Sequence, residues 1–458
     1  MNNASLELGG TNWAEKEGSL LGYAVNDTNN KYSAKEFTFA RGTNLSATRI
    51  GQTGLIEKGR ENVLLQSNQF DTTWIQSNVS VTSGQTGYDG SSDAWLLEVT
   101  ATGSYRRVHQ SGINLDVNTF SIYAKANTSN FLFLLNNKSS TDAVAFFDLS
   151  NGSIGGVNAA IDTKIESVGN GWYRCSITSI FADNQYYVSV ADGISNVTAT
   201  AGASLYIQDA QIEQGLAASP YIETTTTAAQ AGVLENTPRL NYTTGVANPY
   251  LLLEPSRTND SPYSEYISAF NNLSALNVND NATDSPEGVS NAAFIYADAT
   301  SNQHYISNNH SYTSGTAFTI SIFVKVKDYD YFFIRVQDFL SSSTTSFNLS
   351  NGTLAAAGGE DSYTIESFNS DWYRISATYT PTSTTANNNG LRLGFSPTAS
   401  YNYTGDNSSG GYVYGYQFEN NASYATSYIP TYSVSATRAD DTSSKADASA
   451  DINSTEGV

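Results

Sequence analysis

The chain has 458 residues, 39% of them apolar, and a formal net charge of −21, so it is long enough for two or three domains rather than a single core. Such acidity excludes nucleic acid as an expected ligand, because phosphates would be repelled and no basic run offsets the charge. No stretch approaches the roughly 20 consecutive apolar residues that a membrane-spanning helix needs.

Aromatic and small polar residues set the expected secondary structure. The chain has 30 Tyr and 20 Phe but only 9 Pro, which favours short strands and many turns over long helices. The single cysteine, Cys175, excludes an internal disulfide framework. Its counterpart in the repeat described below is Ile375, so we expect Cys175 to be a small core residue.

Residues 1–36 form a polar leader that includes Trp13, which we interpret as an N-terminal attachment segment without a secretion signal. Residues 37–62 are expected to be a connector or corner. Within it, Glu57 precedes Arg60 by three residues, as Glu254 precedes Arg257 later in the chain. This repeated spacing predicts a corner held by an ion pair between the two.

An internal repeat organises the rest of the chain. Residues 165–178 return as 365–378 without a gap, and shorter matches join 120–126 to 320–326 and 147–153 to 347–353. The segments alternate apolar and polar residues, and an Asn-Gly pair ends the third in both copies, which indicates strands and hairpins. We therefore expect an all-β chain of two tandem jelly-roll-like β-sandwiches. The expected ranges are 63–225 for β-sandwich 1, 226–250 for a linker, 251–432 for β-sandwich 2 and 433–458 for a C-terminal connector.

The phase of the repeated Trp-Tyr-Arg strand divides its residues between two faces. Cys175 and Ile177 mark one face as the core, so Trp172 and Arg174 should point the other way. Aromatic rings beside basic groups on an outer sheet face suit a sugar ligand. The candidate ligand residues are Tyr123, Lys125, Trp172, Arg174, Phe323, Lys325, Trp372 and Arg374.

Other interpretations of these residues stay open. Because the set recurs in both copies, the favoured alternative is structural, with Trp172 capping the core and Arg174 paired to Glu213 and stacked on a ring. Trp74 and Trp95, which are not repeated, are read as exposed rings and equally plausible ligand contacts.

Catalytic and metal chemistry have few candidate residues. His304 and His310 lie six apart in a polar, loop-like stretch without a third ligand of matching spacing, which does not suit zinc. Glu166 and Glu366 recur and are expected to be structural rather than a glycosidase pair. We predict no catalytic residues, no enzyme activity and no cofactor, with a structural Ca²⁺ left open because the acidity would suit it.

Several motifs resemble a family of bacteriophage and prophage virion proteins. They are 39–57, 236–242, 252–259 and the strand that begins at 171. Members are described as head or tail fibre components with carbohydrate-binding-like sandwich modules, and the resemblance covers residues 37–440. Members often carry a lectin-like domain after an Ala-Thr-Arg segment. This chain extends only 20 residues beyond 436–438. We expect either that the native chain continues or that this tail is a connector.

The resemblance implies a virion protein assembled in a bacterial cytoplasm and exposed on the particle surface. We expect it to attach to other virion proteins through its N-terminal segment, to form a homo-oligomer, with a trimer as the first expectation, and to present its sandwiches to host surface glycans. The alternatives are a non-binding spacer or capsid decoration protein, and a polysaccharide-degrading enzyme module.

Overall fold

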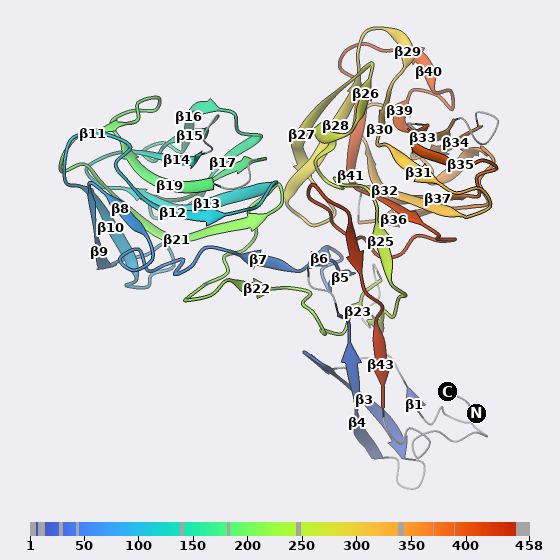
Figure 1. The fold of residues 1–458 in the computed structure, drawn as a ribbon, viewed down its shortest axis with the longest axis horizontal. Coiled ribbons are helices and arrows are strands. Elements are labelled where there is room, and N and C mark those ends of the chain that lie inside the picture. Colours follow the sequence, from blue (N-terminus) through green and yellow to red (C-terminus); the bar gives the residue numbers. More distant parts are fainter. Residues whose placement is uncertain are drawn as a thin grey trace. The chain divides into compact units, whose positions relative to one another are not determined.

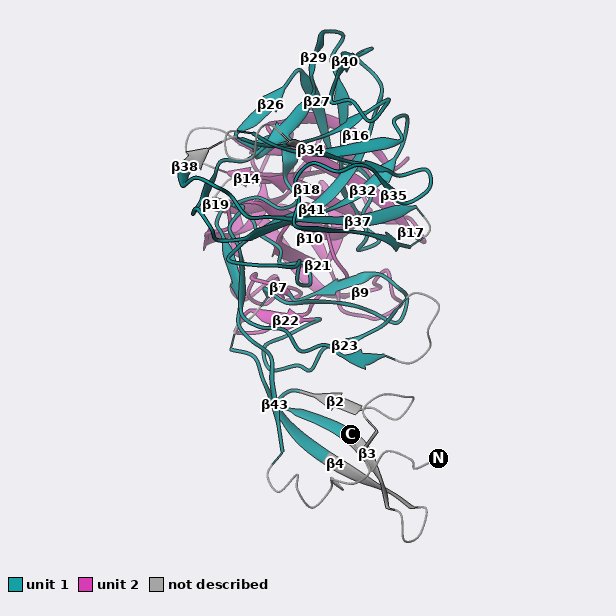
Figure 2. Cartoon of the chain, turned by 90° about the vertical axis from the view of Figure 1, so that its right-hand side faces the viewer, with its two compact units in different colours: residues 1–59, 232–458 teal, residues 60–231 magenta. Residues whose placement is uncertain are grey.

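The computed structural model describes residues 6–7, 14–26, 31–42, 45–137, 142–180, 184–243, 249–337, 343–369, 371–388 and 390–445. Trp13 and the tail from 446 lie outside these ranges. The chain divides into two compact units, residues 60–231 and residues 1–59 with 232–458 (Figure 2). Sandwich 1 makes up the first of these units. The second unit holds sandwich 2, the segments that adjoin it and an N-terminal sheet.

Sandwich 1 consists of two antiparallel sheets (Figure 1). The sheet with the Trp-Tyr-Arg strand, called the WYR sheet below, has the order β17 (Asp162–Gly169), β18 (Trp172–Ser179), β13 (Asn118–Ala126), β21 (Ser204–Gln214), β10 (Ala94–Val99) and β9 (Val79–Gln85). The opposing sheet has the order β16 (Ser153–Asn158), β15 (Ala143–Asp148), β14 (Phe131–Asn137), β19 (Asn184–Ala191), β12 (Arg107–Ile113) and β8 (Ile75–Ser77). Two short pairs, β11 (Gly103–Ser104) with β20 (Thr198–Ala199) and β7 (Arg60–Asn62) with β22 (Ala229–Ala231), complete the unit.

Sandwich 2 repeats this topology strand for strand. Its WYR sheet has the order β36 (Ser362–Phe368), β37 (Trp372–Tyr379), β32 (Phe318–Val326), β41 (Gly410–Asn420), β28 (Ser290–Ala297) and β27 (Leu276–Asp284). The opposing sheet has the order β35 (Thr353–Ala356), β34 (Ser343–Asn348), β33 (Tyr331–Val336), β39 (Leu391–Ser396), β30 (Tyr305–Ser307) and β26 (Asn272–Ser274). Short pieces are β29 (Ser301–Gln303) with β40 (Asn402–Thr404), β31 (His310–Tyr312) with β38 (Thr385–Asn388), and the 3-10 turn η1 (Ile267–Ala269). The predicted all-β tandem sandwich is confirmed.

Short strands from distant parts of the chain form a corner beside sandwich 2. The pairs are β5 (Thr48–Ile50) with β6 (Ile56–Lys58), β23 (Leu240–Asn241) with β24 (Tyr250–Leu251), and β25 (Arg257–Asn259) with β42 (Ala436–Arg438). The N-terminal sheet holds β1 (Leu6–Glu7), β3 (Ser19–Asn26), β4 (Lys31–Ala40) and β43 (Thr442–Ser444), with β2 (Ala14–Lys16) paired to β3. The chain therefore leaves this sheet after β4 and returns to it on the adjacent strand, β43.

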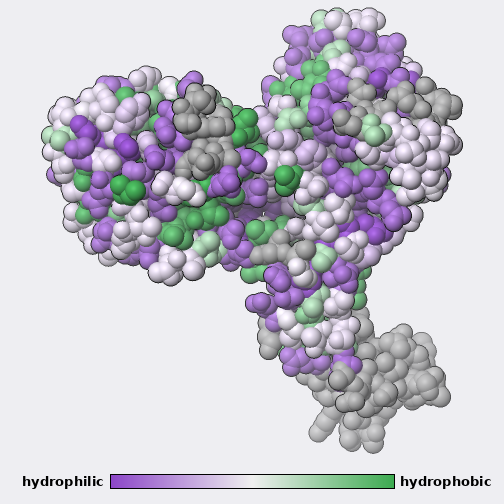
Figure 3. Space-filling model, viewed as in Figure 1, coloured by the Kyte–Doolittle hydropathy of each residue, from purple (hydrophilic) through white to green (hydrophobic). Residues whose placement is uncertain are grey.

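Each sandwich closes around the alternating apolar residues of its strands. Phe120, Ile122, Cys175 and Ile177 are all fully buried between the two sheets of sandwich 1, which confirms the predicted core face and the core role of Cys175. On the face shown in Figure 3, hydrophobic residues appear in scattered patches among hydrophilic ones. In the described part of the chain, no helix is long and apolar enough to cross a bilayer.

The predicted Asn-Gly hairpins are present, and both glycines are required. Gly152 and Gly352 adopt φ values of 71° and 68°, a left-handed conformation that favours glycine. A Cβ on Gly152 would also lie 2.7 Å from the ring of Tyr173, and one on Gly352 would lie 3.2 Å from the ring of Tyr373. In both copies the turn therefore packs closely against the tyrosine of the Trp-Tyr-Arg strand.

Asn62 and Asn259 fix the last long strand of their sandwiches in the same way. Asn259 Nδ2 donates to the carbonyls of Tyr416 at 3.2 Å and Ile429 at 2.9 Å, and its Oδ1 accepts from the amides of Ser261 at 3.1 Å and Phe418 at 3.0 Å. Asn62 makes four equivalent bonds in sandwich 1. Both side chains are fully buried, so the role of the repeated Asn is structural: it links separate backbone segments of the sandwich by hydrogen bonds.

The prediction that Glu57 pairs with Arg60, and Glu254 with Arg257, is wrong. The ion pairs run to other partners: Glu57 binds Arg49 at 2.7 Å, and Arg60 binds Glu213 at 3.4 Å, the partner that the sequence suggested for Arg174. Glu254 binds arginines of the distant motifs, as described below. Sequence spacing identified charged residues of the corner but not their pairing, which depends on which strands meet.

A buried network joins the corner to sandwich 2. Lys58 Nζ lies 2.8 Å from Glu265 Oε1, 2.6 Å from Glu287 Oε1 and 2.7 Å from the hydroxyl of Tyr432. The Tyr428 hydroxyl also donates to Glu265 at 2.9 Å. The side chains of Lys58 and both glutamates are at most 3% exposed, so each charge depends on the others for compensation.

The chain crosses between the two units at Gly59–Arg60 and again at Ala231–Gly232. The backbones of these two crossings approach closely on the sandwich 2 side. A Cβ on Gly232 would lie 2.2 Å from the Lys58 carbonyl oxygen, and one on Gly59 would lie 2.8 Å from that of Val233. Sandwich 1 is therefore an insertion whose two ends leave the second unit from neighbouring positions.

Candidate functional site

The WYR sheets bring the eight predicted ligand residues together as two sets of four. In sandwich 1, Lys125 lies opposite Trp172 and Tyr123 opposite Arg174 on the paired strands β13 and β18. In sandwich 2 the corresponding pairs are Lys325 with Trp372 and Phe323 with Arg374. All eight are on the outer face, as the strand phase predicts, because neighbouring residues fill the core.

In sandwich 1 this face is covered by the protein itself. The ring of Tyr88 stacks on Tyr123 with centroids 3.8 Å apart and planes 8° apart, and meets Trp172 edge-on at 6.4 Å. Trp172 is only 1% exposed. Arg174 lies over the Tyr123 ring at 5.4 Å and donates to Ser121 Oγ at 3.1 Å. These contacts support the structural alternative, since a buried indole offers no face to a sugar.

A strained residue accompanies this cover. Asp209 occupies a β-bulge of β21 with φ of 54°, where sandwich 2 has Gly415. Its carboxylate accepts from the Tyr88 hydroxyl at 3.0 Å. Burial raises the pKa of Asp209 to about 7, because a desolvated carboxylate is costly and Asp93 and Asp89 add negative charge nearby.

The interpretation of Trp74 and Trp95 as exposed rings is wrong. They are 3% and 5% exposed and belong to the core of sandwich 1. Each indole donates to a backbone carbonyl, Trp74 to Gln66 and Trp95 to Asn68, both at 3.0 Å. An unrepeated tryptophan can serve the core of one copy alone, which the sequence comparison of the copies did not reveal.

The outer WYR face of sandwich 2 and the corner enclose a cavity of about 660 Å³. Phe323, Glu366, Phe368 and Arg374 form its sheet side. The corner side consists mainly of polar and aromatic residues, which are Thr48, Arg49, Asn241, Tyr242, Thr243, Tyr250, Glu254, Thr426, Ser427 and Tyr428. Two of the eight predicted residues, Phe323 and Arg374, thus line the cavity. Trp372, 5% exposed, packs in the apolar cluster beside it.

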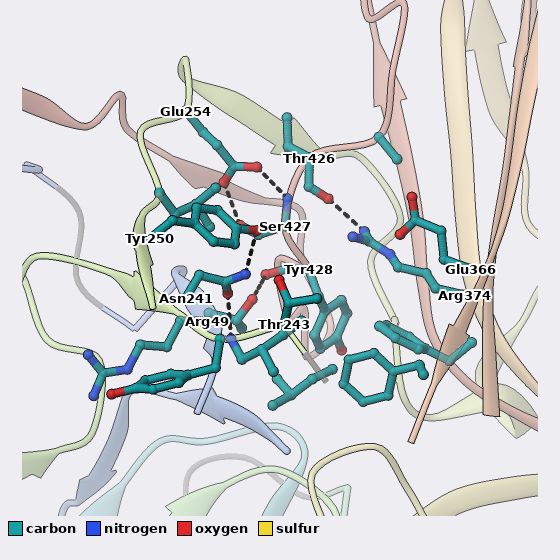
Figure 4. Close-up of a pocket in the computed structure, with 18 of the residues that line it drawn as sticks. Arg49, Asn241, Thr243, Tyr250, Glu254, Glu366, Arg374, Thr426, Ser427 and Tyr428 are labelled. Atoms are coloured by element: carbon teal, nitrogen blue, oxygen red, sulfur yellow. Dashed lines mark hydrogen bonds between the residues drawn. The ribbon is translucent and has the colours of Figure 1, made fainter. Parts of the chain in front are cut away.

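The guanidinium of Arg374 is held in place on the sheet side of the cavity. Its guanidinium donates to Ser321 Oγ at 3.1 Å and to the Thr426 carbonyl at 2.6 Å, and lies 5.4 Å from the Phe323 centroid. Its Nε is buried and has no hydrogen-bond partner among the described residues. Burial lowers the pKa of Arg374, against the opposing effect of nearby glutamates including Glu366. Figure 4 shows the Glu366 carboxylate beside this guanidinium, so a donor and an acceptor stand together.

The opposite wall is held by its own hydrogen bonds. Asn241 donates to the Tyr250 hydroxyl at 2.6 Å and accepts from the Ile50 amide at 2.7 Å (Figure 4). Tyr250 is 46% exposed, so its ring is accessible. Glu254 accepts from the Ser427 amide at 2.7 Å and from its hydroxyl at 2.6 Å, so this carboxylate is occupied by the protein.

Behind this wall, the distant arginine motifs meet in one buried network. Arg239 lies 2.8 Å and Arg438 3.2 Å from Glu254, and both Arg239 and Arg41 contact Asp441. Burial raises the pKa of Glu254, but Arg438 and Arg239 outweigh it and the net shift is downward. The motifs recognised in the sequence are therefore the supports of the cavity wall.

Sequence reasoning missed Arg49, Asn241, Tyr250 and Glu366 as cavity residues. Glu366 lies in the repeated strand, where the sequence favours a structural role, and Asn241 lies in a recognised motif within the expected linker. Recurrence of a residue in both copies favours a structural role over a ligand role.

The description of His304 and His310 as residues of a polar loop is wrong. His304, which lies between β29 and β30, is fully buried, and its Nε2 lies 3.2 Å from the Tyr403 carbonyl. His310 is in β31, stacks on Phe418 at 3.9 Å and contacts the Tyr416 hydroxyl at 2.9 Å. Among the described residues, no group of three or more His, Cys, Asp or Glu could hold a metal ion.

No protein-family model matches the sequence, and a search of curated proteins finds no match either. Among solved structures, the chain is similar to the N-terminal CBM22-1-CBM22-2 tandem domain of Xyn10C from Paenibacillus barcinonensis, with 11% identity, coverage of 83% of this chain and 100% of that one, and a TM-score of 0.25. It is also similar to the vicilin from Solanum melongena, with 8% identity, coverage of 82% and 86%, and a TM-score of 0.11. Such low scores carry no argument, so the fold assignment rests on the strand topology.

Proposed function

We propose that this protein is an adhesion component of a bacteriophage particle and that the cavity of sandwich 2 binds a host surface glycan. The cavity carries the proposal. Its volume, about 660 Å³, falls within the range of about 300–1,000 Å³ typical of small-ligand sites. Its walls combine the accessible ring of Tyr250 with a fixed guanidinium, Arg374, and the exposed carboxylate of Glu366.

This set of groups suits a pyranose. A sugar ring presents an apolar face, which packs on aromatic rings, and hydroxyls that both donate and accept. Arg374 only donates and Glu366 only accepts when ionised, so adjacent hydroxyls of one sugar could be bound by the pair. At the WYR face of sandwich 1, by contrast, the ring of Tyr88 stacks on that of Tyr123.

The location of the protein in the particle is part of the proposal and rests on the sequence resemblance. The N-terminal segment would attach to other virion proteins, and the chain would act as a homotrimer exposed on the particle surface. The protein would then be a binding protein without catalytic activity. A large negative charge favours solubility of such a surface component after release from the host cell.

The test is a glycan array probed with the full chain, followed by titration of any glycan bound. Glu366→Gln should weaken binding by about tenfold or more, since it removes a charge-assisted hydrogen bond worth roughly 1.5–3 kcal/mol. Glu166→Gln is the matched control, because Glu166 lies opposite Arg174 in sandwich 1 as Glu366 lies opposite Arg374. Silence across host surface glycans would reject the proposal in favour of a spacer, and release of reducing sugar would establish an enzyme instead.

A further inference from the structure

We propose that Lys58 and Glu287 condense to an amide, so that the mature chain carries a covalent cross-link between the corner and sandwich 2. The ion pair of these residues, described above, is the state before the reaction. Both belong to the same compact unit. The cross-link does not depend on glycan binding, because the residues that line the cavity include neither of them.

The two reacting groups are in direct contact inside the protein. Lys58 is the last residue of β6, and its Nζ lies 2.6 Å from Glu287 Oε1, in the turn between β27 and β28. The two side chains are 3% and 1% exposed, so the fold holds the amine against the carboxyl group and largely excludes water. Such fixed proximity removes most of the entropy cost of a bimolecular condensation.

The burial of three charges in one place favours a reaction that removes two of them. Lys58 Nζ also lies 2.8 Å from Glu265 Oε1, and the Glu265 side chain is fully buried. One ammonium and two carboxylates leave a net negative charge, and each ion taken out of water costs several kcal/mol. Amide formation converts Lys58 and Glu287 into one neutral group and releases a water molecule to solvent.

Glu265 is placed to move the proton. An amine attacks a carboxyl carbon only after the ammonium has lost a proton. Besides the direct contact, the Tyr432 hydroxyl accepts from Lys58 Nζ at 2.7 Å and donates to Glu265 Oε1 at 3.1 Å. Asn291 Nδ2 donates to the other oxygen, Glu265 Oε2, at 3.3 Å, and is therefore a positioning residue.

The hydroxyl of Tyr414 polarises the carboxyl group that is attacked. It donates to Glu287 Oε1 and to Glu265 Oε1, the latter at 3.1 Å. Tyr414 is fully buried, and burial raises its pKa well above the ordinary value, so the hydroxyl keeps its proton. A fixed donor at this position stabilises the negative charge that develops on the carboxyl oxygen as the new bond forms.

The atoms and electrons of the step balance without an added reactant. Glu265 takes one proton from the Lys58 ammonium, and the nitrogen lone pair forms the Nζ–Cδ bond to Glu287. The bond from Cδ to one carboxyl oxygen breaks, and its electron pair stays on that oxygen. The oxygen leaves as water with two of the ammonium protons, one of them returned by Glu265, and the third proton stays on the amide nitrogen.

Sandwich 1 closes at the corresponding place with neutral residues. Asn68 and Gln208 stand there where Glu265 and Tyr414 stand in sandwich 2. The correspondence follows from the preceding serine, which contacts the same tyrosine hydroxyl in both copies, and from the pairing of β21 with β13 and of β41 with β32. The topology thus forms without these charges. Because a buried ion pair is weak evidence for stability, their presence points to chemistry.

The experiment is intact-mass spectrometry of the purified full chain, followed by tandem mass spectrometry of a tryptic digest. We expect a mass lower than that of the sequence by one water, no cleavage after Lys58, and a branched peptide that joins Lys58 to Glu287. Lys325 and Asp371 are the matched control in the same digest. They lie 3.2 Å apart with side chains 26% and 63% exposed, and should stay unlinked because water solvates both.

Glu265→Gln should abolish the cross-link and show the full mass of its sequence, because an amide accepts a hydrogen bond but does not take up the proton. Circular dichroism checks that the variant is folded. If it is not, the natural chain still decides the question, since its own mass requires no variant.

Three results would count against the proposal. The full sequence mass in the natural, folded chain would overturn the cross-link. Loss of one ammonia, with a link from Lys58 to Asn291, would overturn Glu287 as the acyl partner. A cross-link that persists in Glu265→Gln would overturn the role of Glu265 in the proton transfer.

Discussion

Replacing Asn259 by alanine should destabilise sandwich 2 and leave sandwich 1 unaffected. The amide of Asn259 is fully buried and makes four hydrogen bonds to backbone groups of three segments, two of them to β41. Alanine fills none of these roles and leaves buried carbonyl and N–H groups without partners. At a net value of about 1 kcal/mol for each bond, the loss is about 4 kcal/mol.

The size of the effect makes it measurable by differential scanning calorimetry. A domain of about 150–250 residues loses roughly 2–4 °C of Tm per kcal/mol, so the transition of sandwich 2 should fall by about 8–16 °C. Asn62→Ala is the matched variant and should shift the transition of sandwich 1 by a similar amount. Asn279→Ala, at an exposed position of β27, serves as the control with little change.

Two outcomes would refute this reasoning. If Asn259→Ala shifts its transition by no more than Asn279→Ala does, the four hydrogen bonds contribute little and the repeated asparagine has another duty. If Asn62→Ala and Asn259→Ala shift the same transition, the two sandwiches do not unfold as separate units.

Three further predictions concern buried groups. Lys58→Met should destabilise the unit that contains sandwich 2 by about 3–5 kcal/mol in urea denaturation, because Glu265 and Glu287 lose their cation; an unchanged midpoint would contradict this. Asp209 has a folded-state pKa raised by burial to about 7, so its stabilising contribution is complete below about pH 4 and is lost as the pH rises through about 7. Asp209→Asn should therefore flatten the fall of the sandwich 1 Tm between about pH 4 and 7, and a fall that persists in the variant would argue against this role. Trp172→Ala should lower the Tm of sandwich 1 by removing about 3–5 kcal/mol without changing glycan affinity, whereas lost affinity at an unchanged Tm would place Trp172 in a ligand site.

The sequence predicted the fold well because the repeat and the period-2 alternation are local signals. The gap-free match of 165–178 to 365–378 placed Trp172 and Trp372 on equivalent strands, and the alternation gave the correct core face through Cys175 and Ile177. Both signals lie within single strands, so they do not depend on which loop covers which face of the sandwich.

The burial of the outer face could not be predicted in this way. Tyr88, which covers Trp172, comes from a loop that is not repeated, and Ile56, which packs in the cluster of Trp372, comes from the corner. Likewise, Arg41 and Asp441 are 400 positions apart in the sequence, and nothing local signals their contact. The cavity depends on such long-range pairings, so the sequence identified only Phe323 and Arg374 among its lining residues.

The inserted position of sandwich 1 has a consequence for how such chains can vary. Because its two ends leave the rest of the protein from neighbouring backbone positions, at Gly59 and Gly232, a direct join between them would bypass residues 60–231 and keep the corner, sandwich 2 and the N-terminal sheet continuous. The same junction could accept a different module of similar end-to-end spacing. Gain, loss or exchange of the module at this point would therefore leave the corner, sandwich 2 and the N-terminal sheet unchanged.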